Sequence, residues 1–261
     1  PGTLRGTGAL DRAIPCDPAH DFQPRTADLE AAAKGARSLL VNSPNNPTGV
    51  VYDRATWQAI VKTCITHDLW LISDEVYDTQ VWKGKHISPR SLPDMQERTL
   101  VIGSMSKSHA MTGSRIGWIC GPVPVIEYLT NFATHTTYGV PGFIQDAAEF
   151  ALSQGQELED EVAAPFRRRR RIALDLLTQQ NLVRAVPCSG AMYLMLDMRA
   201  TGLSGEAFAH ALLDAHQIAV MPGESFGQAA AGHIRVAMTV ADDQFSEALA
   251  VLLSFAAEIC E

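Results

Sequence analysis

Short apolar runs alternate with helical patterns along the first half of the chain, and this alternation limits the fold more than any other feature. Residues 38–42, 69–72 and 99–102 have the length and composition of buried strands. Between the first two runs, Asp53 precedes a segment whose apolar residues have the spacing of one helical face, namely Trp57, Ile60, Val61, Cys64 and Ile65. Strands separated by helices predict βαβ units and a mostly parallel sheet.

Weaker patterns complete the first half of the chain. Residues 12–16 and 116–120 are further strand candidates, and residues 28–35 predict a short helix that ends at a glycine. From residue 142 to about residue 180 the pattern is helical. These segments extend the α/β arrangement, for which we expect three layers in the order α/β/α with a mostly parallel sheet.

The last part of the chain has a different order of elements, β-α-β-β-α. It contains predicted strands at 191–196, 218–221 and 233–237, a helix capped by Ser204, and a closing amphipathic helix. This order predicts a smaller C-terminal α+β domain beside the first. We therefore expect a large domain, a connecting helix and a small domain, at residues 1–150, 151–180 and 181–261.

Charge and cysteine content exclude several classes of protein. The chain has 261 residues, a formal net charge of −8 and five cysteines without a Cys-x-x-Cys pair. A negative chain is a poor partner for nucleic acid. Scattered cysteines in odd number predict reduced thiols, no metal site and a cytoplasmic location. No apolar run could span a bilayer and no signal peptide is recognisable, so we expect no membrane association.

Five consecutive arginines, residues 167–171, follow an acidic block at residues 157–161. In a helix, five consecutive side chains point in all directions and cannot form one basic face. We therefore expect a solvated helix whose arginines pair with its own acidic residues.

Polar residues follow three successive predicted strands. Asn46 follows the first, Asp74 and Tyr77 follow the second, and Lys107 follows the third. The carboxyl ends of parallel strands form the edge of the sheet at which ligands bind. Lys107 taken alone fits a solvated loop lysine equally well, but three such groups at one edge favour a functional site.

Together these groups suggest a pyridinium aldehyde cofactor that carries a phosphate. Lys107 would hold the aldehyde as a Schiff base and, once freed, would act as general base. Asp74 would pair with the protonated ring nitrogen, so that the ring can accept electrons. Tyr77 and Asn46 would hydrogen-bond to the ring oxygen.

The phosphate of such a cofactor would bind to the segment around Lys107. Small hydroxyl residues flank the lysine, and an arginine follows eight positions later. Ser104 and Ser106 would donate hydrogen bonds to the phosphate, and Arg115 would bind it with two parallel hydrogen bonds.

Four motifs of this chain resemble those of class I/II aminotransferases in the fold type I pyridoxal-phosphate superfamily. They lie at residues 42–49, 73–77, 104–115 and 233–237. The resemblance implies pyridoxal 5'-phosphate as cofactor, amino-acid and 2-oxo-acid substrates, and a homodimer. It also implies that Arg235 binds the substrate α-carboxylate with help from Asn46. Several segments are similar in sequence to those of arginine–pyruvate transaminases, which suggests arginine or another amino acid as donor and a 2-oxo acid such as pyruvate as acceptor.

Two departures from the family pattern keep other functions open. Ser114 stands where the family usually has an aromatic residue, and the family's N-terminal segment has no counterpart here. The alternatives are a C–S β-lyase with the same cofactor and a truncated fragment without catalytic activity. Tyr193 and Phe226 lie in segments that line the family's substrate side, and packing in the core would explain them equally well.

Overall fold

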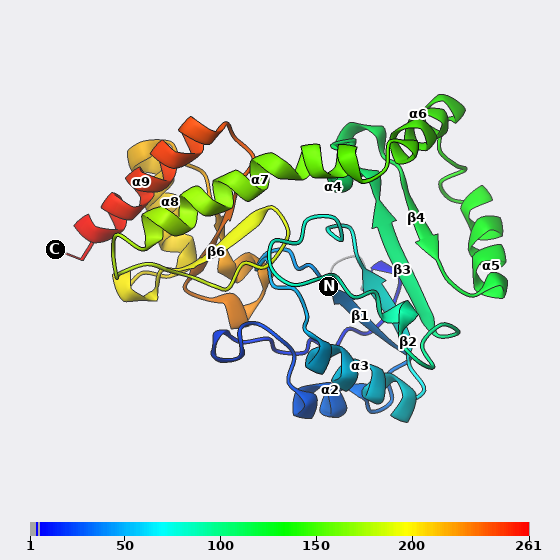
Figure 1. Cartoon of the computed structure of the whole chain (residues 1–261). Coiled ribbons are helices and arrows are strands. Elements are labelled where there is room, and N and C mark those ends of the chain that lie inside the picture. Colours follow the sequence, from blue (N-terminus) through cyan, green and yellow to red (C-terminus); the bar gives the residue numbers. More distant parts are fainter. Residues whose placement is uncertain (1–3, 5, 261) are drawn as a thin grey trace.

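The computed structural model describes Leu4 and residues 6–260, which form two four-stranded sheets among the described residues (Figure 1). The first sheet has the order β1-β2-β3-β4 and the second has the order β5-β6-β8-β7. The strands are β1 (Ser38–Asn42), β2 (Trp70–Asp74), β3 (Thr99–Ser104), β4 (Gly117–Cys120), β5 (Arg184–Ala185), β6 (Tyr193–Asp197), β7 (Met221–Pro222) and β8 (His233–Ala237).

The first sheet is mostly parallel, as the sequence predicts. Strands β1, β2 and β3 are parallel, and β4 is antiparallel to β3. In this register Asn42 lies opposite Asp74, and Asp74 lies opposite Ile102. The carboxyl ends of three strands therefore meet at one edge, which confirms the α/β fold and places the segments that carry Asn46, Asp74 and Lys107 at the same edge of the sheet.

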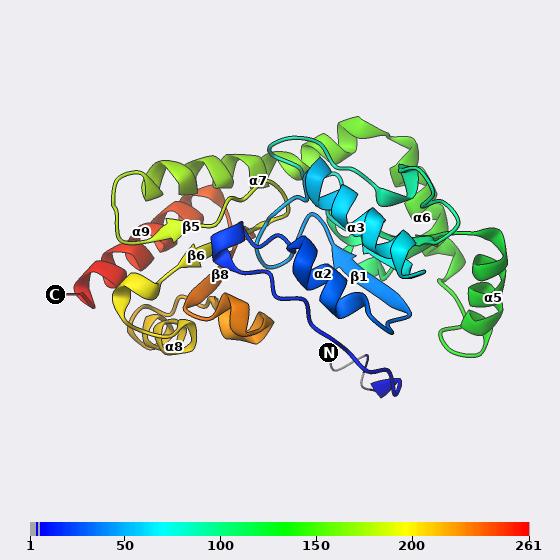
Figure 2. The same cartoon turned by 90° about the horizontal axis from the view of Figure 1, so that it is seen from below.

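Helices α2 (Thr26–Ala33) and α3 (Arg54–Thr66) cover one face of this sheet (Figure 2). They pack onto β1 and β2 through a core that includes Leu29, Trp57 and Leu71. The Asp53 side chain accepts a hydrogen bond of 2.7 Å from the Thr56 amide, so the predicted helix cap is present.

Two further helices lie beyond the antiparallel edge strand, α5 (Val123–Thr134) and α6 (Gly142–Ser153) (Figure 1). The sequence pattern did not predict α5, which has no fully buried residue. One face of the helix, which includes Val125, Ile126 and Leu129, is half-buried. The large exposed side chains on the two helices are Val123, Tyr128, Phe132, Phe143, Phe150 and Leu152.

The second sheet is antiparallel throughout and packs against α8 (Gly205–His216) and α9 (Asp242–Glu258). This is the predicted C-terminal α+β arrangement. The long helix α7 (Gln156–Leu177) runs from the side of α4 (Met105–Ser108) to α9 (Figure 1). The 3-10 turns are η1 (Pro18–His20), η2 (Pro89–Ser91), η3 (Thr112–Ser114), η4 (Arg199–Thr201), η5 (Gly223–Phe226) and η6 (Gln228–Ala230).

Several element predictions are wrong in detail. Residues 12–16 form no strand, and only Met221 of the segment 218–221 lies in a strand, β7. The helical stretch from residue 142 divides into α6 and α7 at Gly155, whose φ of 64° lies in the left-handed region. The domain limits remain a prediction, and their outer bounds, residues 1 and 261, lie outside the described residues.

The arginine run joins α7 to α9 as well as to its own helix. Arg167 lies 3.7 Å from Asp160 within α7, as expected. Arg168 and Arg169 both donate to the carboxylate of Asp242, at 2.8 and 2.7 Å. Because that carboxylate belongs to another helix, the expected pairing within α7 is only part of the arrangement.

No helix in the described part of the chain combines the length and the apolar character that a membrane span requires.

Candidate active site

The loop after β1 is held by its own side chains and by the segment before β6. The Asn42 side chain accepts a hydrogen bond of 2.8 Å from the Asn46 amide. Gly49 has a φ of 71°, and an added Cβ would lie 2.9 Å from both Cys188 Sγ and Gly190 O. Only glycine fits this conformation and this close approach. The peptide bonds before Pro44 and Pro47 are cis.

Lys107 lies on α4, directly after β3. The Ser104 side chain caps this short helix by accepting a hydrogen bond of 3.1 Å from the Ser106 amide. The buried Gln80 side chain donates to the Lys107 carbonyl at 3.1 Å, which ties α4 to the turn after β2. The Lys107 amine has no hydrogen bond or ion pair with any residue that the structure describes, so it is available to a ligand.

Asp74 ends β2 as a half-buried carboxylate. Its Oδ1 accepts a hydrogen bond of 3.2 Å from the Val76 amide, and burial raises the pKa of the carboxyl group. Within residues 6–260, no cationic side chain forms an ion pair with it. A carboxylate in this setting is suited to a cationic ligand group that also carries a hydrogen, such as a protonated ring nitrogen.

Tyr77 is buried, and its hydroxyl is hydrogen-bonded to that of Tyr193 at 3.3 Å. Burial and this hydrogen bond raise the Tyr77 pKa above its ordinary value. The two rings meet edge to face with centroids 5.9 Å apart. Tyr77 is therefore held as a neutral phenol that can donate a hydrogen bond.

Arg235 lies on β8 and faces the loop after β1. It donates a hydrogen bond of 2.9 Å to Asn46 Oδ1. Its guanidinium carbon lies 4.4 Å from the ring centroid of Tyr193 and 5.1 Å from that of Phe226. Its Nε is buried without a hydrogen-bond partner, and none of the described carboxylates forms an ion pair with it. This cation therefore lacks the anion that its burial requires.

The structure brings some predicted site residues into direct contact and leaves others apart. Asn46, Arg235, Tyr193 and Tyr77 form one chain of contacts, and Gln80 links the turn to Lys107. Arg115 is exposed and donates to the Thr112 carbonyl at 3.0 Å; among the described residues it has no hydrogen bond to another predicted site residue.

The predicted phosphate residues have local contacts of their own. The Ser104 hydroxyl caps α4 and donates to the Ile116 carbonyl at 3.4 Å, and Ser106 accepts from Thr112 through its backbone carbonyl. Both serines are half-buried beside Lys107 in sequence. Their phosphate role, and that of Arg115, remains a prediction.

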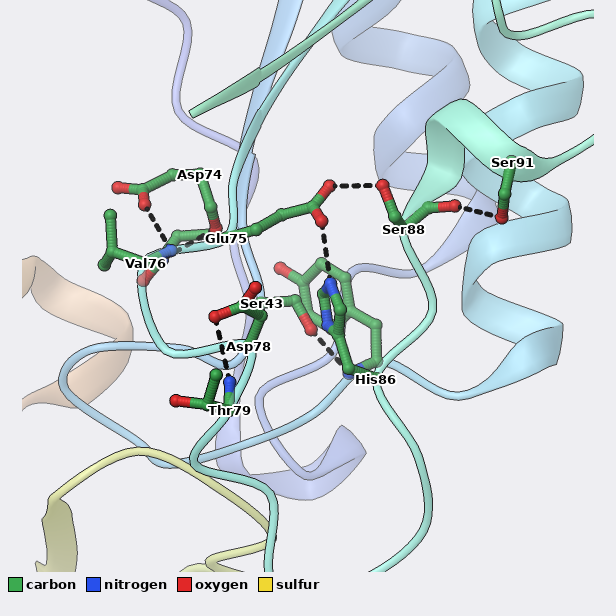
Figure 3. A network of polar contacts seen from close by, with 11 residues as sticks. Ser43, Asp74, Glu75, Val76, Asp78, Thr79, His86, Ser88 and Ser91 are labelled. Carbon is green, nitrogen blue, oxygen red and sulfur yellow. Dashed lines mark hydrogen bonds and ion pairs between the residues drawn. The ribbon is translucent and has the colours of Figure 1, made fainter. Parts of the chain in front are cut away.

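Sequence reasoning missed two residues of this region. No sequence pattern points to Gln80, because its hydrogen bond to the Lys107 carbonyl depends on how the turn after β2 meets α4. Glu75 is fully buried and bonded to His86 and Ser88 (Figure 3). Strand alternation could have indicated that Glu75 points away from Asp74, but not what it would meet.

The comparison with protein families identifies the chain. The model of aminotransferase class I and II matches residues 3–252. The chain belongs to the class I and II aminotransferase family. This membership agrees with the fold type I architecture inferred from the four motifs.

Individual relatives of this aminotransferase chain differ in substrate. It is 41% identical to the arginine–pyruvate transaminase of Pseudomonas aeruginosa, over 97% of this chain and 64% of that protein. It is 33% identical to aromatic-amino-acid aminotransferase 2 of Thermococcus litoralis, over 90% of this chain and 61% of that protein. The chain thus spans less than two thirds of these relatives.

Solved aminotransferases have the same fold. The aspartate aminotransferase of Thermus thermophilus with maleate matches with a TM-score of 0.87 and 32% identity, over 97% of this chain and 66% of that one. The aromatic aminotransferase of Pyrococcus horikoshii matches with a TM-score of 0.88 and 32% identity, over 94% of this chain and 66% of that one.

Proposed function

We propose that the whole protein is a pyridoxal-phosphate-dependent transaminase that moves an amino group from an amino acid to a 2-oxo acid such as pyruvate. The observation that carries this proposal is Arg235, a part-buried cation without a carboxylate partner among the described residues, hydrogen-bonded to Asn46 at the ligand-binding edge of the sheet. A carboxylate-bearing substrate supplies the missing anion.

The residues present also suit the cofactor. Asp74 has the half-buried, unpaired carboxylate that a protonated ring nitrogen needs, and the Lys107 amine is free of partners within the described chain. Tyr77 and Asn46 would donate hydrogen bonds to the ring oxygen. Ser104, Ser106 and Arg115 would hold the phosphate.

When bound, the cofactor ring accepts the electron pair released at the substrate α-carbon. Lys107 would take the proton from that carbon and return it to the cofactor, because its amine has no other hydrogen bond or ion pair within the described chain. Arg235 would orient the α-carboxylate with two parallel hydrogen bonds. Asp74 would keep the ring nitrogen protonated through its negative charge.

Arginine is the donor that we propose first, because of the 41% identity to an arginine–pyruvate transaminase. The cavity of about 430 Å³ that touches Asn46 and Phe226 has no acidic residue among the described residues that line it. A guanidinium-bearing side chain would therefore need a carboxylate partner from outside this lining, whereas Phe226 within it offers an aromatic face.

We also propose a homodimer, supported by the exposed aromatic side chains of α5 and α6, among them Tyr128, Phe132 and Phe143. Sedimentation of the whole protein would give twice the monomer mass, and a monomer at micromolar concentration would contradict this. The cytoplasmic location expected from the cysteines remains a prediction.

A screen of amino donors against pyruvate and 2-oxoglutarate tests the proposed reaction on the whole protein with added cofactor. The expected result is keto-acid formation from arginine or another amino acid that depends on the acceptor and is lost in Lys107→Ala. Release of pyruvate and ammonia from cystathionine without an acceptor would instead indicate the β-lyase. If no cofactor binds at all, the remaining alternative is the truncated fragment without catalytic activity.

A further inference from the structure

A second polar cluster lies directly behind Asp74 (Figure 3). Glu75 follows Asp74 in the chain, and its side chain points to the opposite side of the backbone. Its Oε2 accepts a hydrogen bond of 2.7 Å from His86 Nε2, and its Oε1 accepts one of 2.9 Å from Ser88 Oγ. With 4% of its surface exposed, Glu75 is a buried carboxylate with both oxygens occupied.

Glu75 is part of the turn that carries the candidate site. Its backbone amide donates to Ile102 O on β3 at 2.9 Å, and its carbonyl accepts from the Asp78 amide at 2.9 Å. Within the same turn Tyr77 faces Tyr193, and Gln80 donates to the Lys107 carbonyl. The orientation of the turn therefore affects three of the residues assigned to the cofactor.

The bonds of Glu75 connect this turn to a segment distant from the cofactor. His86 and Ser88 precede η2, and Ser88 also accepts through its carbonyl from the Ser91 hydroxyl at 2.7 Å. A buried carboxylate that accepts two hydrogen bonds is costly to displace, because the loss of either bond would leave a buried polar atom without a partner. The turn is thus fixed from behind by Glu75.

We propose that Glu75 is a positioning residue: held by His86 and Ser88, it fixes the turn on which Asp74 and Tyr77 meet the cofactor ring. This inference rests on the proposed function. The Glu75 side chain points away from Asp74 (Figure 3), so it would act through the direction of Asp74 and Tyr77 and not by contact with the cofactor.

Charge strengthens the same role. Asp74, Glu75 and Asp78 place three carboxyl groups within five residues, and the His86 ring lies against this group through its 2.7 Å contact with Glu75. Burial raises the pKa of Asp78, and the nearby His86 lowers it again. Removal of either member of the Glu75–His86 pair would therefore leave a buried charge or polar atom that only a movement of the turn relieves.

The test compares Glu75→Gln with Glu30→Gln in the whole protein. Glu30 has a similar set of partners at the C-terminal end of α3, His67 at 2.7 Å and Thr63 at 2.8 Å, and although its side chain is more exposed than that of Glu75, it is the control for the loss of such a pair of hydrogen bonds. Glutamine keeps the shape, but its amide nitrogen cannot accept the second hydrogen bond. Pyridoxal-phosphate dissociation is measured by titration, and the visible absorbance of the bound cofactor is followed against pH.

We expect Glu75→Gln to weaken cofactor binding about ten-fold, the lower end of the loss seen when outer partners of metal ligands are removed, and to move the pH response of the absorbance. Glu30→Gln should leave both at the wild-type values. Equal binding by the two variants, or weaker binding by Glu75→Gln with an unaltered pH response, would overturn the proposal.

A milder variant keeps the inference testable if Glu75→Gln does not fold. Ser88→Ala removes one of the two hydrogen bonds, and Ser88→Thr retains the hydroxyl. We expect weaker cofactor binding by the first and wild-type binding by the second; wild-type binding by both would count against the role of Glu75. Failure of the wild-type protein to bind the cofactor would instead refute the proposed function, so the two failures are distinguishable.

Discussion

Arg235→Lys tests the assignment of the carboxylate-binding residue. Lysine keeps the positive charge but loses the planar fork that matches a carboxylate with two parallel hydrogen bonds. In this site the fork also supplies the donor for Asn46 Oδ1, and it is stacked between Tyr193 and Phe226. A compact ammonium cannot bind a carboxylate with two parallel hydrogen bonds, donate to Asn46 and lie over both rings at once.

The magnitude follows from the hydrogen bonds lost. One charge-assisted hydrogen bond contributes about 1.5–3 kcal/mol. At about 1.4 kcal/mol for each factor of ten, the loss lowers kcat/KM about 10- to 100-fold. Arg235→Leu removes the charge as well and should cost more.

Steady-state kinetics of the whole protein with its best donor measures this effect. Arg25→Lys is the control, because Arg25 forms an exposed ion pair with Asp28 and no hydrogen bond with Asn46, Tyr193 or Arg235. The cofactor dissociation constant should not change in Arg235→Lys, because the arginine is assigned to the substrate. An unchanged kcat/KM, or a loss that appears only as weaker cofactor binding, would refute the reasoning.

Three further predictions concern stability. Asp53→Ala should lower the free energy of unfolding by about 1 kcal/mol in urea, because α3 loses its capping side chain; an unchanged midpoint would contradict the cap. Gly49→Ala should cost about 1–3 kcal/mol by the same assay, because of its positive φ and the contact with Cys188; wild-type stability would show that the loop adapts. Asp74→Asn should stabilise the cofactor-free protein at neutral pH, since the raised pKa of the folded carboxyl means that its ionisation opposes folding. This gain should vanish as the pH falls towards the ordinary carboxyl range, and a gain that grows there would contradict the sign.

The sequence predicts those elements whose patterns are local. Strands β1 and β8 match the predicted residues 38–42 and 233–237, because each is a short apolar run between turn-forming residues. The cap at Asp53 is also local. Helix α5 was not predicted; its apolar face, which includes Val125, Ile126 and Leu129, is only half-buried in the structure.

The contacts of the site depend on the meeting of distant segments, which the sequence pattern does not contain. Asn46 and Arg235 are 189 positions apart and touch only because the second sheet lies against the loop after β1. Tyr193 could have been core or substrate-facing, and it is both buried and in contact with Arg235. The Arg115 side chain bonds to the Thr112 carbonyl and not to another predicted site residue of the described chain. Its phosphate role therefore stays a prediction.

The most direct test of the central claim is to locate the lysine that binds the cofactor. The whole protein is incubated with pyridoxal 5'-phosphate, reduced with borohydride and analysed by peptide mass spectrometry. We expect one modified lysine, Lys107, among the five in the chain, which are Lys34, Lys62, Lys83, Lys85 and Lys107. The visible absorbance of the bound cofactor should disappear in Lys107→Ala. Stoichiometric modification of another lysine, or none in a folded wild-type protein, would contradict the assignment.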